Sequence, residues 1–160
     1  MTLEWSARDV QKLRAMQFAV IGMAAGLVGL VVIVLSIAPP SASVAAAAAR
    51  IWLAGLAIVT ALLLISILLV RAWTTSQLRD FASRAARGDD PPGQVTYAYG
   101  SGRLIAAALA ESIGVLGAVA FILTQEPLTL VACAISALLV LAHMPTVGEF
   151  RRLAQSAIVH

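Results

Sequence analysis

Glu111 is the only charged residue in the apolar run from 104 to 124, which makes its carboxyl group the first candidate for chemistry. A helix of ~20 residues rises ~1.5 Å per residue and therefore crosses the ~30 Å hydrocarbon core of a bilayer. An ionisable group at that depth costs at least ~2.5–3.5 kcal/mol, and such groups mark functional sites by default. The sequence therefore predicts a site at Glu111.

Binding of a proton or a small cation is one interpretation of this residue. Desolvation favours the neutral form of a carboxyl group, which is the property that a proton-binding site needs. No basic residue lies at comparable depth, because Arg103 is ~12 Å away along the helix. We expect hydroxyl groups to be the hydrogen-bond partners instead, namely Ser112, Ser136, Thr60 and Ser66. The alternative is that Glu111 only hydrogen-bonds to neighbouring helices and fixes their register.

Two sets of small residues predict close contacts between helices. Small side chains that recur every three or four residues form a smooth ridge, along which another helix can approach. The sets are Ala106, Ala110, Gly114 and Gly117 beside Glu111, and Gly22, Gly26 and Gly29 in the first apolar run.

Motifs for other chemistry are missing from the sequence. It contains no G-x-x-x-x-G-K-[ST], G-x-S-x-G, H-E-x-x-H or C-x-x-C. Cys133 is the only cysteine, and one of the two histidines is the last residue. The sequence therefore predicts no catalytic residue, no metal site, no cofactor and no enzymatic activity.

Composition places the chain in a membrane. It is 61% hydrophobic and only 12% charged, and its mean hydropathy is +0.93. Soluble domains carry about 25% charged residues. Four apolar runs are each long enough to cross a bilayer, so we expect an all-α membrane protein with one four-helix bundle over residues 1–160.

The order of these runs predicts two antiparallel hairpins. The spans cover about 17–38, 51–70, 103–124 and 128–144, with Pro39–Pro40 ending the first span and a loop over 71–102. Short amphipathic segments precede the first span and follow the last. In the last segment Thr146 and Glu149 form a capping box, and Phe150 lies on an apolar face that suits a membrane surface.

Lysine and arginine residues predict the orientation. They concentrate before the first span, in the loop over 71–102 and in the tail, whereas the first connector offers only Arg50. By the positive-inside rule, both termini and this loop are cytoplasmic. The expected location is a bacterial cytoplasmic (inner) membrane. Because the basic residues border apolar runs, the net charge of +3 indicates contact with lipid headgroups and not with nucleic acid.

One stretch carries a resemblance to a known family. Residues 107–117, Ala-Ala-Leu-Ala-Glu-Ser-Ile-Gly-Val-Leu-Gly, resemble the acid-bearing helix of rotary ATPase c-type proteolipids. Glu111 matches the carboxylate of that family and Gly117 its glycine six residues on, which implies ion binding. The glycine-rich partner helix and the polar Arg-Gln-Pro-like loop are absent, so the chain is not interpreted as a rotor subunit. As a whole it is similar to small four-span bacterial membrane proteins with an acid in the third helix.

Two hypotheses about function follow. The first is a small structural or accessory subunit that works by helix packing, with copies of itself or with other membrane subunits. The second is a proteolipid-like protein that binds a proton or a cation at Glu111.

Overall fold

The computed structural model describes residues 7–37, 46–88 and 93–159, and the predicted stop at Pro39–Pro40 lies outside these ranges. The described chain is helical and contains no strand. Its helices are α1 (Ala7–Ile37), α2 (Ala46–Arg87), α3 (Gly93–Thr124), α4 (Leu128–Ala142) and α5 (Val147–Val159).

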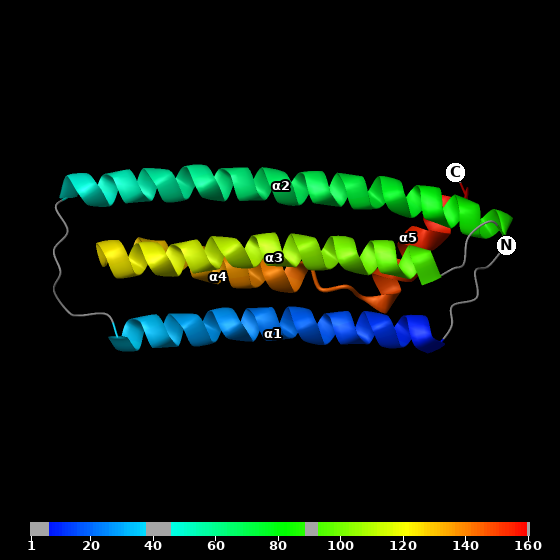
Figure 1. The fold of residues 1–160 in the computed structure, drawn as a ribbon, viewed down its shortest axis with the longest axis horizontal. Helices are drawn as coiled ribbons and strands as arrows, with labels where there is room; N and C mark the ends of the chain where they lie inside the picture. The colour runs from blue at the N-terminus through cyan, green and yellow to red at the C-terminus, as the bar shows by residue number, and fades with distance from the viewer. Residues whose placement is uncertain (1–6, 38–45, 89–92, 160) are drawn as a thin grey trace.

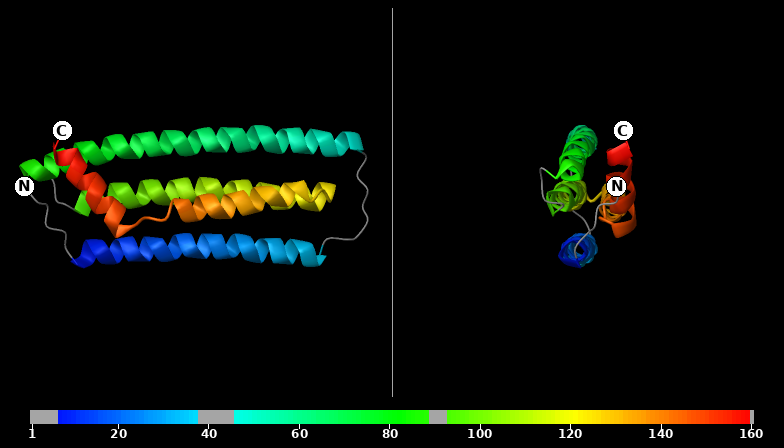
Figure 2. Two further views of the ribbon diagram at one scale, coloured as in Figure 1. Left: turned by 180° about the vertical axis from the view of Figure 1, so that it is seen from behind. Right: turned by 90° about the vertical axis from the view of Figure 1, so that its right-hand side faces the viewer.

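Helix α3 is the centre of the bundle and packs against all four other helices. Figure 1 shows α1 and α2 on opposite sides of α3, and the end-on view in Figure 2 shows α4 beside it. Half of the residues in the most apolar window of α3 are buried, compared with 6% in α2. The helix that carries Glu111 is therefore the best enclosed of the long helices, whereas few residues in the most apolar part of α2 are buried.

Small side chains allow this close packing around α3. A Cβ atom added to Gly117 would lie 2.8 Å from the carbonyl oxygen of Thr129 in α4. One added to Gly114 would lie 2.7 Å from Ser136 of α4 and 2.7 Å from Leu27 of α1. Real Cβ atoms do not approach so closely, so both positions require glycine as the helices stand.

The described helices are apolar enough to indicate a membrane-embedded protein. Helices α1, α2 and α3 are each long and apolar enough to cross a membrane. Helix α4 covers only ~22 Å at ~1.5 Å per residue, and it reaches spanning length only together with α5, from which it is bent by 61°. The chain thus has three or four candidate spans. Pro145 lies at the bend, where its ring cannot continue a helix.

The packing differs from the two simple hairpins that the sequence suggests. Helices α3 and α4 are joined by a short turn, in which Gln125 adopts a left-handed conformation with φ of 56°, and they pack closely. Helices α1 and α2 are antiparallel, but α3 lies between them (Figure 1). Each of the first two helices packs mainly on α3, whose small residues allow both to approach.

Most of the loop expected over 71–102 is helical. Helix α2 continues to Arg87, and α3 already begins at Gly93. Gly100 and Gly102 lie within α3, where they allow close contact with Met16 of α1 and Thr74 of α2, respectively. Tertiary packing thus favours the helix over the low helix propensity of glycine.

The extended ends of these helices form a second core with α5. Leu13 of α1, Leu78 of α2, Tyr99 of α3 and Phe150 of α5 are all buried in one apolar cluster. The rings of Tyr99 and Phe150 lie 5.3 Å apart between centroids. The expectation that Phe150 faces a membrane surface is therefore wrong, because this side chain packs into the protein.

Polar contacts fix α5 and the bend before it. The backbone N–H of Glu149 donates to Oγ1 of Thr146 at 3.3 Å, which forms one half of the predicted capping box. The Glu149 carboxylate does not complete the box, because it pairs with Arg103 and accepts a hydrogen bond from the Tyr99 hydroxyl at 3.1 Å. At the bend, Nε2 of Gln17 donates to the carbonyl oxygen of Pro145 at 2.7 Å.

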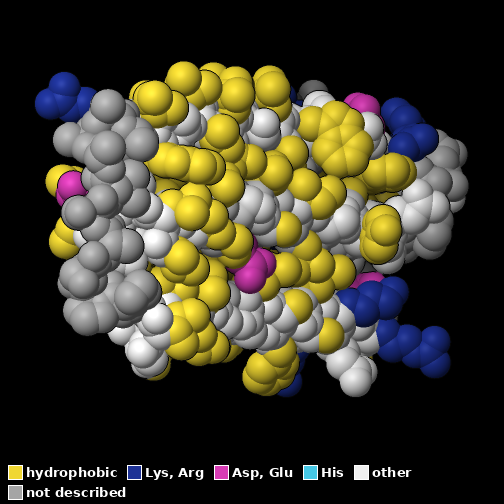
Figure 3. Space-filling model, turned by 60° about the vertical axis from the view of Figure 1, so that its left-hand side comes forward, with side chains coloured by type: hydrophobic (Ala, Val, Ile, Leu, Met, Phe, Trp, Pro, Cys, Tyr) yellow, Lys and Arg dark blue, Asp and Glu magenta, His cyan; other side chains and the backbone are white. Residues whose placement is uncertain are grey.

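Charge is unevenly distributed along the bundle. All lysine and arginine residues except Arg50 lie toward the end where α1 and α3 begin, which we call the basic end. Figure 3 shows a largely hydrophobic flank between charged ends, with acidic atoms in its middle. An apolar flank bounded by charged ends matches the layers of a bilayer.

Candidate functional site

Glu111 is half-buried in the middle of α3. Within the part of the chain that the structure describes, its carboxylate makes no hydrogen bond or ion pair. Three neighbours on α3, Ala108, Ser112 and Val115, are exposed, so the acid lies at the border between the bundle interior and its surroundings. A carboxylate in this position is available to something outside the described bundle.

Helix geometry places Glu111 on the side of α3 that is turned away from α2. Gly102 faces Thr74 of α2, and nine residues, or ~2.5 turns, separate Gly102 from Glu111. Gly100, which faces Met16 of α1, lies ~3 turns from Glu111 and therefore on nearly the same side. The acid thus lies near the edge of the contact between α1 and α3.

Because Glu111 is turned away from α2, it lies apart from two of its expected hydroxyl partners, Thr60 and Ser66. Thr60 and Ser66 belong to α2, which packs on the opposite side of α3. The hydroxyl of Ser66 donates to the carbonyl oxygen of Leu62 at 2.9 Å, within its own helix. Neither residue is brought together with Glu111.

The other two hydroxyls also have different partners. Ser112 is exposed and donates to the carbonyl oxygen of Ala108 at 3.0 Å. Ser136 is fully buried and donates across the helix interface to the carbonyl oxygen of Ala110 at 2.6 Å. The Ser112 bond stays within its own helix, which is common for serine in apolar helices, whereas the Ser136 bond links two helices. The structure therefore does not assemble the four hydroxyls into a ligand set around Glu111.

The two sets of small residues lie in different environments. Ala106, Ala110, Gly114 and Gly117 are all buried at contacts of α3 with its neighbours. Gly22, Gly26 and Gly29 are exposed, and a Cβ atom added to any of them would meet nothing within 4 Å. The buried face of α1 is instead formed by larger residues such as Val20 and Leu27. The glycines of α1 are thus free for contacts outside the chain.

Depth relates the exposed glycines to the acid. Helices α1 and α3 run parallel, with Met16 opposite Gly100 and Leu27 opposite Gly114. The level of Glu111 therefore falls near residue 24 of α1, between Gly22 and Gly26. An acid and two exposed glycines occur at one depth.

The sequence did not predict the polar cluster of Arg103, Glu149 and Tyr99 at the basic end. Arg103 and Glu149 are far apart in sequence, and their pairing depends on the way α5 folds back over the bundle. The one available signal was the capping pair of Thr146 and Glu149, which predicted the start of α5 but not the surface that it contacts.

The described chain is all-helical, and its long apolar helices indicate a membrane-embedded protein. Among the described residues, no group of three or more His, Cys, Asp or Glu side chains could hold a metal ion. Comparison with protein-family models, with curated proteins and with solved structures finds no match.

Proposed function

We propose that this chain is a small integral membrane subunit that works by helix packing in a homo- or hetero-oligomeric assembly. In this proposal Glu111 contacts a helix of another subunit, which donates a hydrogen bond to the carboxyl group. The assembly is a structural or accessory one, and the chain performs no catalysis.

The observation that carries the proposal is the position of Glu111. Its carboxyl group lies midway along an apolar helix, at the border of the bundle, without a polar partner among the described residues. Polar groups in apolar surroundings are costly when they are left unpaired. Interhelical hydrogen bonds are a usual way to satisfy such groups inside a membrane.

Exposed surface at the same depth supports the proposal. Gly22 and Gly26 leave room for the backbone of a neighbouring helix close to the level of Glu111. A helix that approaches closely gains van der Waals contact, which drives association in lipid.

The alternative is a proteolipid-like role, in which Glu111 binds a proton or a small cation. Its partial exposure favours this alternative too, because an ion must reach the carboxylate. The two functions differ in what they require of residue 111. Packing needs a hydrogen-bonding group, which glutamine also provides, whereas ion binding needs an ionisable group.

The proposed location is a bacterial cytoplasmic membrane, with the basic end and both termini on the cytoplasmic side. The support is the concentration of lysine and arginine at the basic end. Reporter domains fused to either terminus would test it, and we expect both to report the cytoplasmic side.

Substitutions at Glu111 test the function. We compare the yield of intact assembly in Glu111→Gln and Glu111→Leu, using Glu126→Gln and Glu126→Leu as matched controls at an exposed acid outside the spanning helices. Glutamine at 111 should retain the assembly and leucine should reduce it, while both controls should behave like the natural chain. If leucine at 111 leaves the assembly intact, the packing role is wrong.

A further inference from the structure

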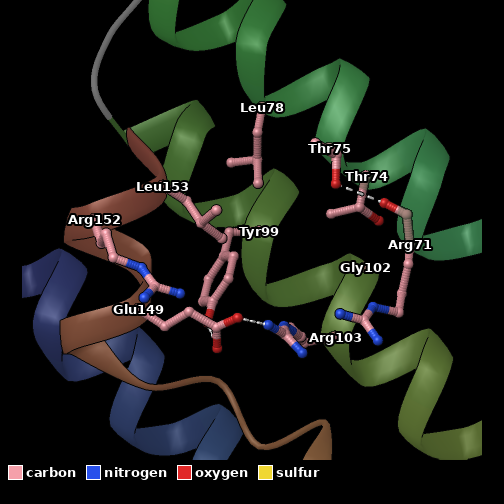
Figure 4. Close-up of a pocket in the computed structure, with 10 residues that line it drawn as sticks. All are labelled: Arg71, Thr74, Thr75, Leu78, Tyr99, Gly102, Arg103, Glu149, Arg152 and Leu153. Atoms are coloured by element: carbon pink, nitrogen blue, oxygen red, sulfur yellow. Dashed lines mark hydrogen bonds and ion pairs between the residues drawn. The ribbon is translucent and has the colours of Figure 1, made fainter. Parts of the chain in front are cut away.

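A cleft lined by both polar and apolar residues lies at the basic end, between α2, α3 and the docked α5. Its volume is about 210 Å³, and Arg71, Arg103 and Arg152 contribute to its walls. Figure 4 shows that these arginines come from three different helices, with Arg71 and Arg152 on either side of the pair formed by Arg103 and Glu149. Three guanidinium groups thus converge on one small space.

The charges in this cleft do not balance. Glu149 is its only acidic residue, and this carboxylate pairs with Arg103. Arg71 and Arg152 are exposed, and the guanidinium group of neither makes an ion pair or a hydrogen bond with another described residue. Two positive charges of the cleft are therefore not paired within the described chain, and they favour an anion as the ligand.

The position of the cleft indicates which anions can reach it. Arg71 directly follows the apolar run of α2, and Arg103 directly precedes that of α3. Both residues therefore lie where hydrocarbon gives way to headgroups, if the apolar helices span a bilayer. Lipid phosphates occupy this layer, and basic pockets between membrane helices bind such headgroups.

The size and donor chemistry of the cleft fit a phosphate group. Pockets that enclose a whole drug-sized ligand measure ~300–1,000 Å³, so this cleft suits a headgroup or a small anion. Guanidinium groups bind phosphate through two parallel N–H···O bonds. We propose that the cleft binds the phosphate group of an anionic ligand, with Arg71 and Arg152 as its direct contacts.

Docking of α5 is what completes this site. Glu149 attaches α5 to α3 through Arg103 and the hydroxyl of Tyr99, and Arg152 lies one turn further along α5. Gly102 lines the cleft and leaves space there for Thr74 of α2. The pair of Arg103 and Glu149 therefore positions Arg152 opposite Arg71 and is not itself the anion site.

The experiment measures ligand binding to the full chain in detergent, by titration of the thermal unfolding temperature. The probes are phosphatidylglycerol in micelles, phosphatidylcholine as the lipid without net charge, and inorganic phosphate at constant ionic strength. The variants are Arg71→Gln and Arg152→Gln. Their matched controls are Arg79→Gln on α2 and Arg151→Gln on α5, exposed arginines that do not line the cleft.

We expect affinity for a phosphate probe to fall about tenfold in each cleft variant, which is the usual effect of one lost hydrogen bond to a charged group. Each control should change affinity less than about twofold. Binding of phosphatidylglycerol alone identifies a lipid headgroup as the ligand, and binding of inorganic phosphate alone identifies a soluble phosphate compound. Binding of both probes shows that the phosphate group is sufficient for recognition. The proposal is overturned if neither probe binds, or if the controls weaken binding as much as the cleft variants.

Discussion

Ser136 of α4 donates a 2.6 Å hydrogen bond to the carbonyl oxygen of Ala110, the residue directly before Glu111 in α3. This bond ties α4 to α3 and turns the serine hydroxyl toward the backbone. The acid beside it gains no partner from the contact. One residue of α3 thus belongs to the packed interior, and the next is directed to the border of the bundle.

The contrast between buried and exposed glycines gives the first prediction. Gly114→Leu should prevent proper folding, because a side chain there would overlap Leu27 and Ser136. Overpacking of a core costs typically ~1–3 kcal/mol, and a leucine adds more than one methylene group. Gly26→Leu should leave the free energy of unfolding of the single chain nearly unchanged, since its position is open. Thermal unfolding of both variants in detergent provides the measurement.

The same Gly26→Leu variant should weaken the assembly. A bulky side chain on an exposed helix face keeps a partner helix at a distance. If Gly26→Leu assembles as well as the natural chain, the exposed glycines of α1 are not part of the contact surface.

Release of α5 gives the next prediction. Glu149→Ala removes the partner of Arg103 and the acceptor for the Tyr99 hydroxyl. We expect the free energy that holds α5 on the bundle to fall by about 1–3 kcal/mol, which is the usual penalty for partners left unpaired. Hydrogen exchange of the α5 backbone should become faster while exchange in α3 is unchanged. Equal exchange in the variant and the natural chain would show that the pair does not hold α5.

Phe150 should contribute more to stability than its charged neighbours on α5. It is 2% exposed in the second core, and replacing a buried phenylalanine by alanine costs ~3–5 kcal/mol. Arg151→Ala is the control, because exposed positions without special contacts change stability by less than ~0.5 kcal/mol. If Phe150→Ala were as mild as this control, α5 would lie on the membrane surface, as the sequence alone suggests.

The amphipathic pattern of α5 explains why sequence could predict only part of this arrangement. A helix with Phe150 on one face and Arg151 and Arg152 beside it suits both a membrane surface and a protein core. The sequence does not tell which apolar surface that face meets. The extended ends of α2 and α3 supply a protein surface, and this depends on tertiary packing.

Periodicity and composition were more informative about α3. The small residues Ala106, Ala110, Gly114 and Gly117 predicted a contact ridge, and the structure buries all four. Gly100 and Gly102 are ambiguous in the sequence, because glycine weakens a helix by itself and also permits close packing. Local propensity cannot separate these two roles.

The sequence also predicted the candidate site only in part. Residue type and depth were enough to single out Glu111, but not to give its direction around α3. That direction follows from the contacts of Gly100 with α1 and Gly102 with α2. Depth alone therefore also selected Thr60 and Ser66, which belong to α2, on the side of α3 opposite to Glu111.

Reaction with a hydrophobic carbodiimide should distinguish packing from ion binding. This reagent attacks protonated carboxyl groups in apolar surroundings. In our proposal a partner helix covers Glu111, so labelling should be slow in native membranes and faster after dissociation of the assembly in detergent. Rapid labelling in native membranes that added cations slow would favour the ion-binding alternative instead.

The most direct test of the assembly role is the mass of the native particle, measured by native mass spectrometry after mild extraction from the membrane. The chain alone has a mass of 16.6 kDa. We predict a larger particle that contains several copies or additional polypeptides and that dissociates in the Glu111→Leu variant. A single 16.6 kDa chain under the mildest extraction would contradict the proposal that Glu111 contacts another subunit.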